Sequence, residues 1–325
     1  MNFLNKINVN YNIKLIEDYL SNKDFSNILE KLTNLQKKNP RIFYEILLNL
    51  DPQFTDLSNR DLYKKKFIWL FSFDDRDSIY IQNFLEYYCN RNLPVDCLFS
   101  EYSELISEKL LNLQIDSIPK ELDFEYTIHN SSVLQNLVLF SENKSFFFLR
   151  ACAAFFEFLE KSKYLIYPNS TLCYFYVIRN PKEIFYRLKN QYQSAEAAMY
   201  ELFNYGDSLF INENNKQNKH QYYQNKQSWN INVNSWIDDN VFSSFRGNLI
   251  NFEELENNTE ETLVNTIFHL KQSGLDIPIN YDVISSYVEE NPFPKENYDQ
   301  ISNNDKKKLL TNLDKTILEK FKFDI

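Results

Sequence analysis

The chain has 325 residues, of which 43% are hydrophobic and 16% aromatic, enough to build one large domain or two modest ones. Its formal net charge of −10 argues against a general nucleic-acid binder, because neutralising phosphates requires clustered Lys and Arg. The amino terminus has no apolar segment of the signal-peptide kind, and no apolar run reaches the roughly 18 residues of a membrane span. We therefore expect a cytoplasmic protein without a membrane span.

Residue types that form metal and phosphate motifs are scarce. The four cysteines have no CxxC spacing and the three histidines lie far apart, so we expect reduced, mostly buried thiols and no metal site. The chain has only three glycines, which form neither a GxGxxG nor a GxxxxGK loop. These residues are Cys89, Cys97, Cys152, Cys173, His129, His220, His269, Gly206, Gly247 and Gly274.

Residues 1–60 predict a helical segment. Apolar residues recur at helical spacing in residues 13–20, 25–37 and 41–50. One helix pair cannot bury its own apolar face, so this segment is either a cap packed on the following domain or a small interaction module. Residues 61–325 form the second predicted domain.

The next stretch, residues 66–90, predicts a strand, a polar loop and a helix. Phe67–Phe71 is a buried-strand candidate, residues 72–78 are polar, and residues 79–88 form an amphipathic helix. The loop carries Asp74, Asp75 and Asp77. Their carboxylates suit a solvated turn that caps the helix, or a hard cation, although the glycine and final glutamate of a calcium loop are missing.

Residues 98–140 predict mainly helical and connecting structure, and a third strand begins at Ser145. A stronger pattern follows in residues 174–192. Tyr174–Ile178 is an apolar, β-branched and aromatic run typical of a strand buried in a parallel sheet, and Pro181 suits the first turn of a helix. Arg179 then lies at the carboxyl end of the strand, where its guanidinium suits a phosphate beside a helix N-terminus. It can equally pair with a carboxylate.

The order strand, Arg-x-Pro, helix resembles the 3′-phosphate-binding segment of the sulfotransferase superfamily, and most closely that of its bacterial members. A later segment also resembles this family: a helix with Trp229 and Trp236, a strand, the turn Phe252–Leu255 and another helix. The resemblance covers roughly residues 66–270. It implies an α/β fold with a central parallel sheet flanked by helices, similar to P-loop proteins. It also implies transfer of a sulfuryl group from 3′-phosphoadenosine-5′-phosphosulfate to a hydroxyl or amine.

The chain departs from this family pattern at most of its functional elements. Asp74, Asp75 and Asp77 stand where the donor loop has proline, the catalytic lysine and glycine, and these carboxylates repel sulfate and phosphate. Arg187 replaces the serine that also binds the 3′-phosphate. Leu149–Ala151 occupies the position of the general base, and the tail from Tyr281 lacks the Arg-Lys-Gly loop.

Only Arg179 keeps its family role cleanly, with Arg187 as a second candidate for contacting an anion. We predict no catalytic residue, and a sulfotransferase-like protein that has lost transfer and binds or holds an unidentified protein partner without a cofactor. One alternative is a divergent active enzyme that uses the same donor. The other is an unrelated helical adaptor. The enzyme hypothesis requires a basic pocket near Ser72 and Arg179, whereas the scaffold hypothesis requires that place to be acidic or filled. The adaptor hypothesis requires that the protein lack a central parallel sheet.

Overall fold

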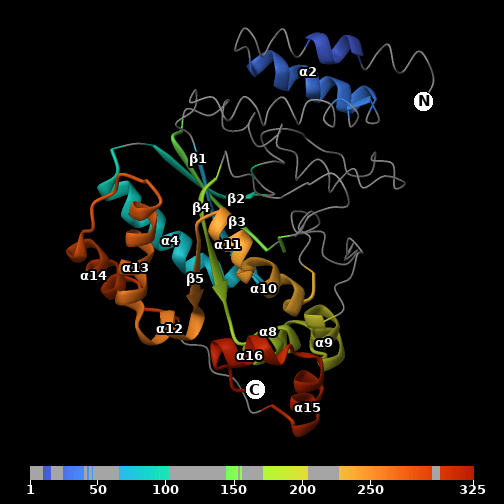
Figure 1. Ribbon diagram of the computed structural model, residues 1–325, viewed down its shortest axis with the longest axis vertical. Coiled ribbons are helices and arrows are strands. Elements are labelled where there is room, and N and C mark those ends of the chain that lie inside the picture. Colours follow the sequence, from blue (N-terminus) through green and yellow to red (C-terminus); the bar gives the residue numbers. More distant parts are fainter. Residues whose placement is uncertain are drawn as a thin grey trace.

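The structure is a computed structural model, and it describes residues 10–15, 25–39, 42–43, 46, 66–94, 96–102, 105, 144–152, 154–155, 171–203, 227–294 and 301–325. Its centre is a five-stranded sheet with the order β2-β3-β1-β4-β5, in which every pairing is parallel (Figure 1). The strands are β1 (Lys66–Ser72), β2 (Cys97–Glu101), β3 (Phe146–Ala151), β4 (Thr171–Ile178) and β5 (Gly247–Asn251).

Helices flank this sheet and confirm the predicted α/β class. The described helices are α2 (Phe25–Lys38), α4 (Asp75–Asn92), α8 (Pro181–Tyr192), α9 (Ala195–Phe203), α10 (Trp229–Ile237), α11 (Asp239–Ser244), α12 (Phe252–Asn257), α13 (Thr259–Gln272), α14 (Tyr281–Glu290), α15 (Asn303–Asn312) and α16 (Lys315–Phe321). Among the described residues, none of the helices combines the length and apolar character needed to cross a bilayer.

The two faces of the sheet are covered by different helices, as Figure 1 shows. Helices α4, α13 and α14 pack on one face, where alternate residues of β1 and β4 such as Leu70 and Phe175 join their cluster. Helices α8 to α11 and the carboxyl-terminal helices share the second cluster, with Trp69 and Tyr176. Because both faces are covered, all eight residues of β4 are buried, which explains its continuous apolar sequence.

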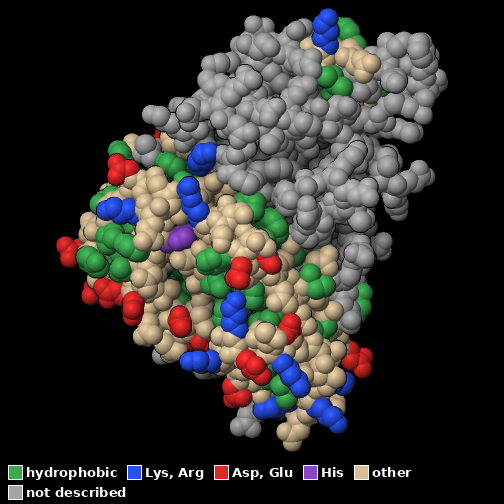
Figure 2. All heavy atoms as spheres, viewed as in Figure 1, with side chains coloured by type: hydrophobic (Ala, Val, Ile, Leu, Met, Phe, Trp, Pro, Cys, Tyr) green, Lys and Arg blue, Asp and Glu red, His purple; other side chains and the backbone are tan. Residues whose placement is uncertain are grey.

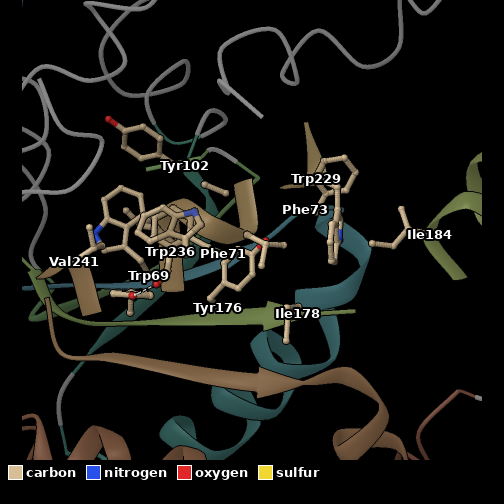
Figure 3. Packing of buried hydrophobic residues seen from close by; sticks show 14 of the residues in the cluster. Trp69, Phe71, Phe73, Tyr102, Tyr176, Ile178, Ile184, Trp229, Trp236 and Val241 are labelled. Atoms are coloured by element: carbon tan, nitrogen blue, oxygen red, sulfur yellow. Dashed lines mark hydrogen bonds between the residues drawn. The ribbon is translucent and has the colours of Figure 1, made fainter. Parts of the chain in front are cut away.

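Aromatic side chains fill the second cluster. Trp69 stacks on Phe71 with ring centroids 5.5 Å apart, and Phe71 stacks on Trp236 at 3.8 Å. Figure 3 shows these rings above β4, with Phe73 and Trp229 at the carboxyl end of the sheet. Offset aromatic pairs add to the stabilisation from buried area, so this layer makes a firm support for the ends of β1 and β4.

The neighbouring strands β1 and β4 continue in opposite directions. After β1 the chain passes through α4 to β2 at one edge of the sheet, whereas after β4 it passes through α8 to α11 to β5 at the other edge. The carboxyl ends of β1 and β4 therefore form a topological switch point, the place where open α/β sheets hold ligands. The predicted site residues lie at this point.

Among the described residues, most elements predicted from Phe67 onward are present and three predictions were wrong, while most of residues 98–140 lies outside the described residues. Residues 97–101 form β2, although this region was expected to be helical or connecting. Helix α4 begins at Asp75 rather than at Ile79, since Asp74 caps it by accepting a hydrogen bond from the Arg76 N–H. The sequence also predicts one terminal helix from Asp305 to Lys322, but the structure divides it into α15 and α16, because Leu313 is extended and Asp314 caps a new helix.

The amino-terminal prediction is tested only in small part. Residues 10–15 are helical and α2 coincides with the second predicted helix, while the rest of residues 1–60 lies largely outside the described residues. Leu32 of α2 and Phe43 belong to the same apolar cluster as Trp69. The boundary between residues 1–60 and 61–325 stays a prediction.

Charged side chains are mixed on the described surface. On the face seen in Figure 2, Lys and Arg side chains are interspersed with Asp and Glu over the carboxyl-terminal helices. The net charge of −10 is therefore not gathered into one acidic patch on that face.

Gly247 begins β5 where the backbone passes against a ring. A Cβ added at this residue would lie 2.5 Å from Tyr174 Oη and 2.7 Å from a ring carbon of Phe242. The Tyr174 hydroxyl donates a hydrogen bond to the Trp236 carbonyl, which fixes the ring. A side chain at residue 247 must therefore displace packed groups.

We predict that Gly247→Ala lowers the free energy of unfolding by about 1–3 kcal/mol through overpacking. Urea unfolding measures this value. The matched control is Asn248→Ala on the same strand, where the side chain is partly exposed and the loss should be smaller. Equal losses in the two variants would contradict the close-approach argument.

Candidate functional site

The candidate site is built from the loop after β1 and the turn after β4. The turn has the predicted form: Asn180 caps α8 by accepting a hydrogen bond from the Lys182 N–H, and Pro181 occupies the first turn. Arg179 therefore lies between the end of β4 and the N-terminus of α8. Only 2% of its side chain is exposed.

The Arg179 guanidinium is held by two carboxylates and one ring. Its Nη1 donates to Asp77 Oδ1 at 2.9 Å, and its Nε donates to Glu183 Oε2 at 2.9 Å. The guanidinium carbon lies 3.9 Å from the centroid of the Phe252 ring, a cation–π contact. Of the two sequence interpretations, the pairing of Arg179 with a carboxylate is the one found.

Arg187 reaches the same carboxylate from the next turns of α8. Its Nη1 donates to Asp77 Oδ1 at 2.7 Å, and its Nη2 lies 3.0 Å from Asp74 Oδ2. Asp77 and Arg187 are 1% and 8% exposed. The structure thus brings both predicted anion-contacting residues together, with one oxygen of Asp77 accepting from both.

Asp74 and Asp75 complete the acidic loop. Asp74 is buried and accepts from Arg76 Nε at 3.0 Å and Arg76 Nη2 at 2.8 Å. Burial, and then the nearby Asp74 charge, raises the pKa of Asp75. The prediction that the acidic turn caps the helix is confirmed for Asp74. The prediction that the turn is solvated was wrong, because its carboxylates face guanidiniums. Within the described residues, no group of His, Cys, Asp and Glu has an arrangement that suits a metal ion.

Charges within this cluster balance. Three guanidiniums, from Arg76, Arg179 and Arg187, contact three carboxylates, from Asp74, Asp77 and Glu183. Buried ions cost several kcal/mol each to desolvate, and their partners offset that cost only when the geometry is good. The cluster, which we call the switch-point ion cluster, therefore carries no net positive charge for an incoming anion.

Beside the ion cluster lies a buried polar pair on the aromatic face. The Tyr176 hydroxyl donates to Asn232 Oδ1 at 2.8 Å, and Asn232 Nδ2 donates to the Cys152 carbonyl at 3.0 Å. Burial, and then the charge of Asp77, raises the pKa of Tyr176 well above its usual value. Tyr176 is therefore a neutral structural donor and not a proton acceptor.

The end of β3 supplies no general base. Leu149 and Ala151 are buried on β3, and Arg150 Nη1 approaches the Asp75 carbonyl at 3.5 Å. A guanidinium is protonated at all ordinary pH values and cannot accept a proton.

Glu253, in the first turn of α12, is a group that the sequence analysis did not select. Burial, and then the charge of Glu183, raises the pKa of Glu253 to about 7. Its Oε1 is buried and receives no hydrogen bond from a described residue. The signal in the sequence was its place directly after β5, since the carboxyl ends of parallel strands meet at one edge of the sheet.

Two other contacts of Arg179 also escaped the sequence analysis. Glu183 lies four residues after Arg179, a spacing that favours ion pairs on helices, so it was within reach of sequence reasoning. Phe252 was noted only as part of a turn, and its stacking on Arg179 requires knowledge of the strand order.

The sequence matches no protein-family model and no curated protein. The expectation of a sulfotransferase-like protein therefore depends on the segments around Arg179 and Trp229.

We predict that Asp77→Asn lowers the free energy of unfolding by about 3–5 kcal/mol, because it leaves two buried guanidiniums with too little negative charge. Thermal and urea unfolding measure this loss. The matched control is Arg76→Ala, which breaks an ion pair whose guanidinium is 43% exposed and should cost about 0–1 kcal/mol. A loss as small as that of the control would contradict the importance of the buried pairing.

Glu253 should make stability fall as pH rises. Its pKa is about 7 in the folded chain against 4.5 ordinarily, so the folded state binds the proton more tightly. The contribution of Glu253 to the free energy of unfolding is fully present below pH 4.5 and is lost as the pH rises to about 7. Because the carboxyl is partly solvated, we expect Glu253→Gln to be about 1–2 kcal/mol more stable than the parent at pH 8 and similar near pH 4.5.

Unfolding midpoints of both proteins across this pH range test the Glu253 prediction. Glu254→Gln, an exposed residue of the same turn, is the matched control and should leave the pH profile unchanged. A difference in unfolding midpoint between Glu253→Gln and the parent that does not vary with pH would contradict the prediction.

Proposed function

We propose that this chain is a sulfotransferase-like protein that no longer transfers sulfuryl groups and uses its fold to bind or hold another protein. One observation carries this proposal: Asp77 Oδ1 accepts hydrogen bonds from both Arg179 and Arg187 at the switch point of the sheet. The chain's own carboxylate thus takes the position in which a bound phosphate would receive these donors.

Electrostatics favours loss of the donor site. A site for phosphate and sulfate needs unneutralised guanidinium, ammonium or N–H groups directed at the anion. Here each guanidinium of the switch-point ion cluster contacts a carboxylate, and Glu253 adds another carboxyl group beside Glu183. Displacing Asp77 by a phosphate would leave its carboxylate buried without its partners, which is costly.

The family part of the proposal is supported by the order of elements. Strand β4, Arg179, Pro181 and α8 reproduce the Arg-x-Pro segment, and α10, β5, α12 and α13 follow in the order that the family pattern requires. If the chain were an active enzyme, its donor would be 3′-phosphoadenosine-5′-phosphosulfate, with Arg179 and Arg187 on the 3′-phosphate.

The alternatives differ in how they agree with these contacts. A divergent active sulfotransferase is favoured by the place of Arg179 at the carboxyl end of β4, but it requires the basic pocket that Asp74 and Asp77 neutralise. An unrelated helical adaptor was expected to lack a central parallel sheet. The sheet is present, and we do not propose the adaptor.

We predict that the purified protein gives no heat of binding with 3′-phosphoadenosine-5′-phosphate at millimolar concentration. Titration calorimetry makes this measurement, with Arg179→Ala as the matched variant. Micromolar binding by the parent that is abolished in Arg179→Ala would overturn the proposal and favour the divergent enzyme.

A second arm of the same experiment tests whether Asp77 takes the place of an anion. Removing its carboxylate in Asp77→Ala should let inorganic phosphate bind between Arg179 and Arg187, and a ligand that binds only the folded state raises its stability. The midpoint temperature of thermal unfolding should therefore rise with phosphate concentration for Asp77→Ala and stay constant for the parent. Equal responses of the two proteins would contradict the placement.

A further inference from the structure

Helices α13 and α14 leave an open groove between them. A hollow of about 640 Å³ lies there, and its apolar lining comes from Val264 of α13 and from Tyr281 and Val288 of α14. Glu260 and Glu261, in the first turn of α13, line the same hollow. The Tyr281 side chain is 59% exposed, and tyrosine is a residue type that protein interfaces favour. We call these five residues the acidic groove.

The helices that form this groove carry most of the net negative charge of the chain. Residues 252–294, which contain α12, α13 and α14, include nine Asp or Glu, one Lys and no Arg. Within the described part of the chain, Glu260 and Glu261 belong to no ion pair, and Glu260 accepts a hydrogen bond from the Ser285 hydroxyl. Both carboxylates are therefore available to cations from outside the molecule.

A surface of opposite charge lies on the carboxyl-terminal helices. Its residues line a second open hollow, of about 690 Å³, and are Lys306, Lys307 and Leu310 of α15 and Lys315 of α16. Leu310 is 42% exposed, and residues 303–322 contain six Lys against three Asp or Glu. Among the described residues, the three lysines of the hollow form no ion pair. We call these four residues the basic surface.

The acidic groove and the basic surface of one molecule cannot meet. In Figure 1, α13 and α14 lie at the left of the molecule, whereas α15 lies at its lower end. Each surface combines exposed apolar side chains with unpaired charges of one sign, and the two signs are opposite. The complement of each surface is therefore present on every other copy of the chain.

We propose that the partner of the acidic groove is a second copy of this chain, which docks there through its basic surface. The exposed Leu310 of one copy then packs against Tyr281 of the next, and lysines of one copy lie beside glutamates of the other. This inference is independent of the proposed function, because neither surface includes a residue of the switch-point ion cluster.

The character of the two surfaces sets the strength of this contact. Stable interfaces use roughly 20–30 residues on each partner, and the two hollows are lined by far fewer, so we expect weak association. Salt screens exposed charges, and association should weaken as the salt concentration rises. Like charges placed opposite each other suppress a contact, so reversing the charges of one surface should separate the copies.

The first test is sedimentation equilibrium of the full chain at increasing protein concentration. At low salt the mean mass should rise above that of the monomer, and high salt should return it to the monomer value. Leu310→Asn should weaken the association at every salt concentration, because it removes the apolar contact and leaves the charges. A parent that stays monomeric at millimolar concentration and low salt would overturn the proposal.

Two charge-reversed variants locate the contact. The acidic variant, Lys306→Glu with Lys307→Glu, has two acidic surfaces, and the basic variant, Glu260→Lys with Glu261→Lys, has two basic ones. Each variant should associate at least roughly tenfold more weakly than the parent, because its surfaces repel. An equimolar mixture should associate again, since the unchanged groove of the acidic variant accepts the unchanged basic surface of the basic variant.

Recovery in the mixture separates a lost contact from a lost fold, because misfolded variants would not recover. The matched control is Lys308→Glu with Lys320→Glu, the same change in net charge at exposed lysines of α15 and α16 outside the hollow. Its association should stay close to that of the parent. Association like that of the parent in either charge-reversed variant, or a mixture that stays monomeric, would overturn the proposal.

Discussion

The pairing of one buried carboxylate with two buried guanidiniums is the constraint on which the rest of this site depends. Asp77 comes from the first turn of α4, Arg179 from the end of β4, and Arg187 from the middle of α8. The three charges hold the ends of two strands and the starts of two helices in one geometry. Because each ion is almost fully buried, none is tolerable without the others.

Because the chain has few glycines, other residues occupy most of the described positions with positive φ. Four described residues other than glycine adopt positive φ: Gln193, Gln227, Arg246 and Lys322. The left-handed backbone conformation costs each of these residues about 1 kcal/mol relative to glycine. Two hydrogen bonds hold Arg246: its Nη1 donates to the Ser273 carbonyl, and its own carbonyl accepts from His269 Nε2. Gly247 is kept for a different reason, the contact with the Tyr174 ring.

Sequence reasoning predicted the elements whose signal is local. The strand Tyr174–Ile178 and the helix after Pro181 were predictable because a doubly covered strand is continuously apolar and Pro-initiated helices have a fixed signature. Strand β2 was missed because it is a short edge strand that includes Ser100 and Glu101, and its partly exposed residues give no continuous apolar run. The start of α4 was missed because its first turn is polar and so lacks the regular spacing of apolar residues that predicts a helix.

The partners of Arg179 lay beyond local reasoning for a topological reason. Asp77 and Phe252 approach Arg179 from the ends of the two strands that neighbour β4. Sequence alone identified both segments but not their positions in the sheet. The carboxylate interpretation of Arg179 could therefore be stated from sequence, but it could not be separated from the phosphate interpretation.

Two departures from the sulfotransferase pattern become one interaction in the structure. Compared with that pattern, Asp77 stands in place of a glycine and Arg187 in place of a serine. Each change alone would be unfavourable: Arg187 would add a buried positive charge, and Asp77 would add a buried negative charge beside a single arginine that Glu183 also engages. Together they form a hydrogen bond of 2.7 Å. If the chain is related to that family, as proposed, this pair supplies an internal anion where the family binds an external one, and it lets the loop after β1 be acidic beside Arg179.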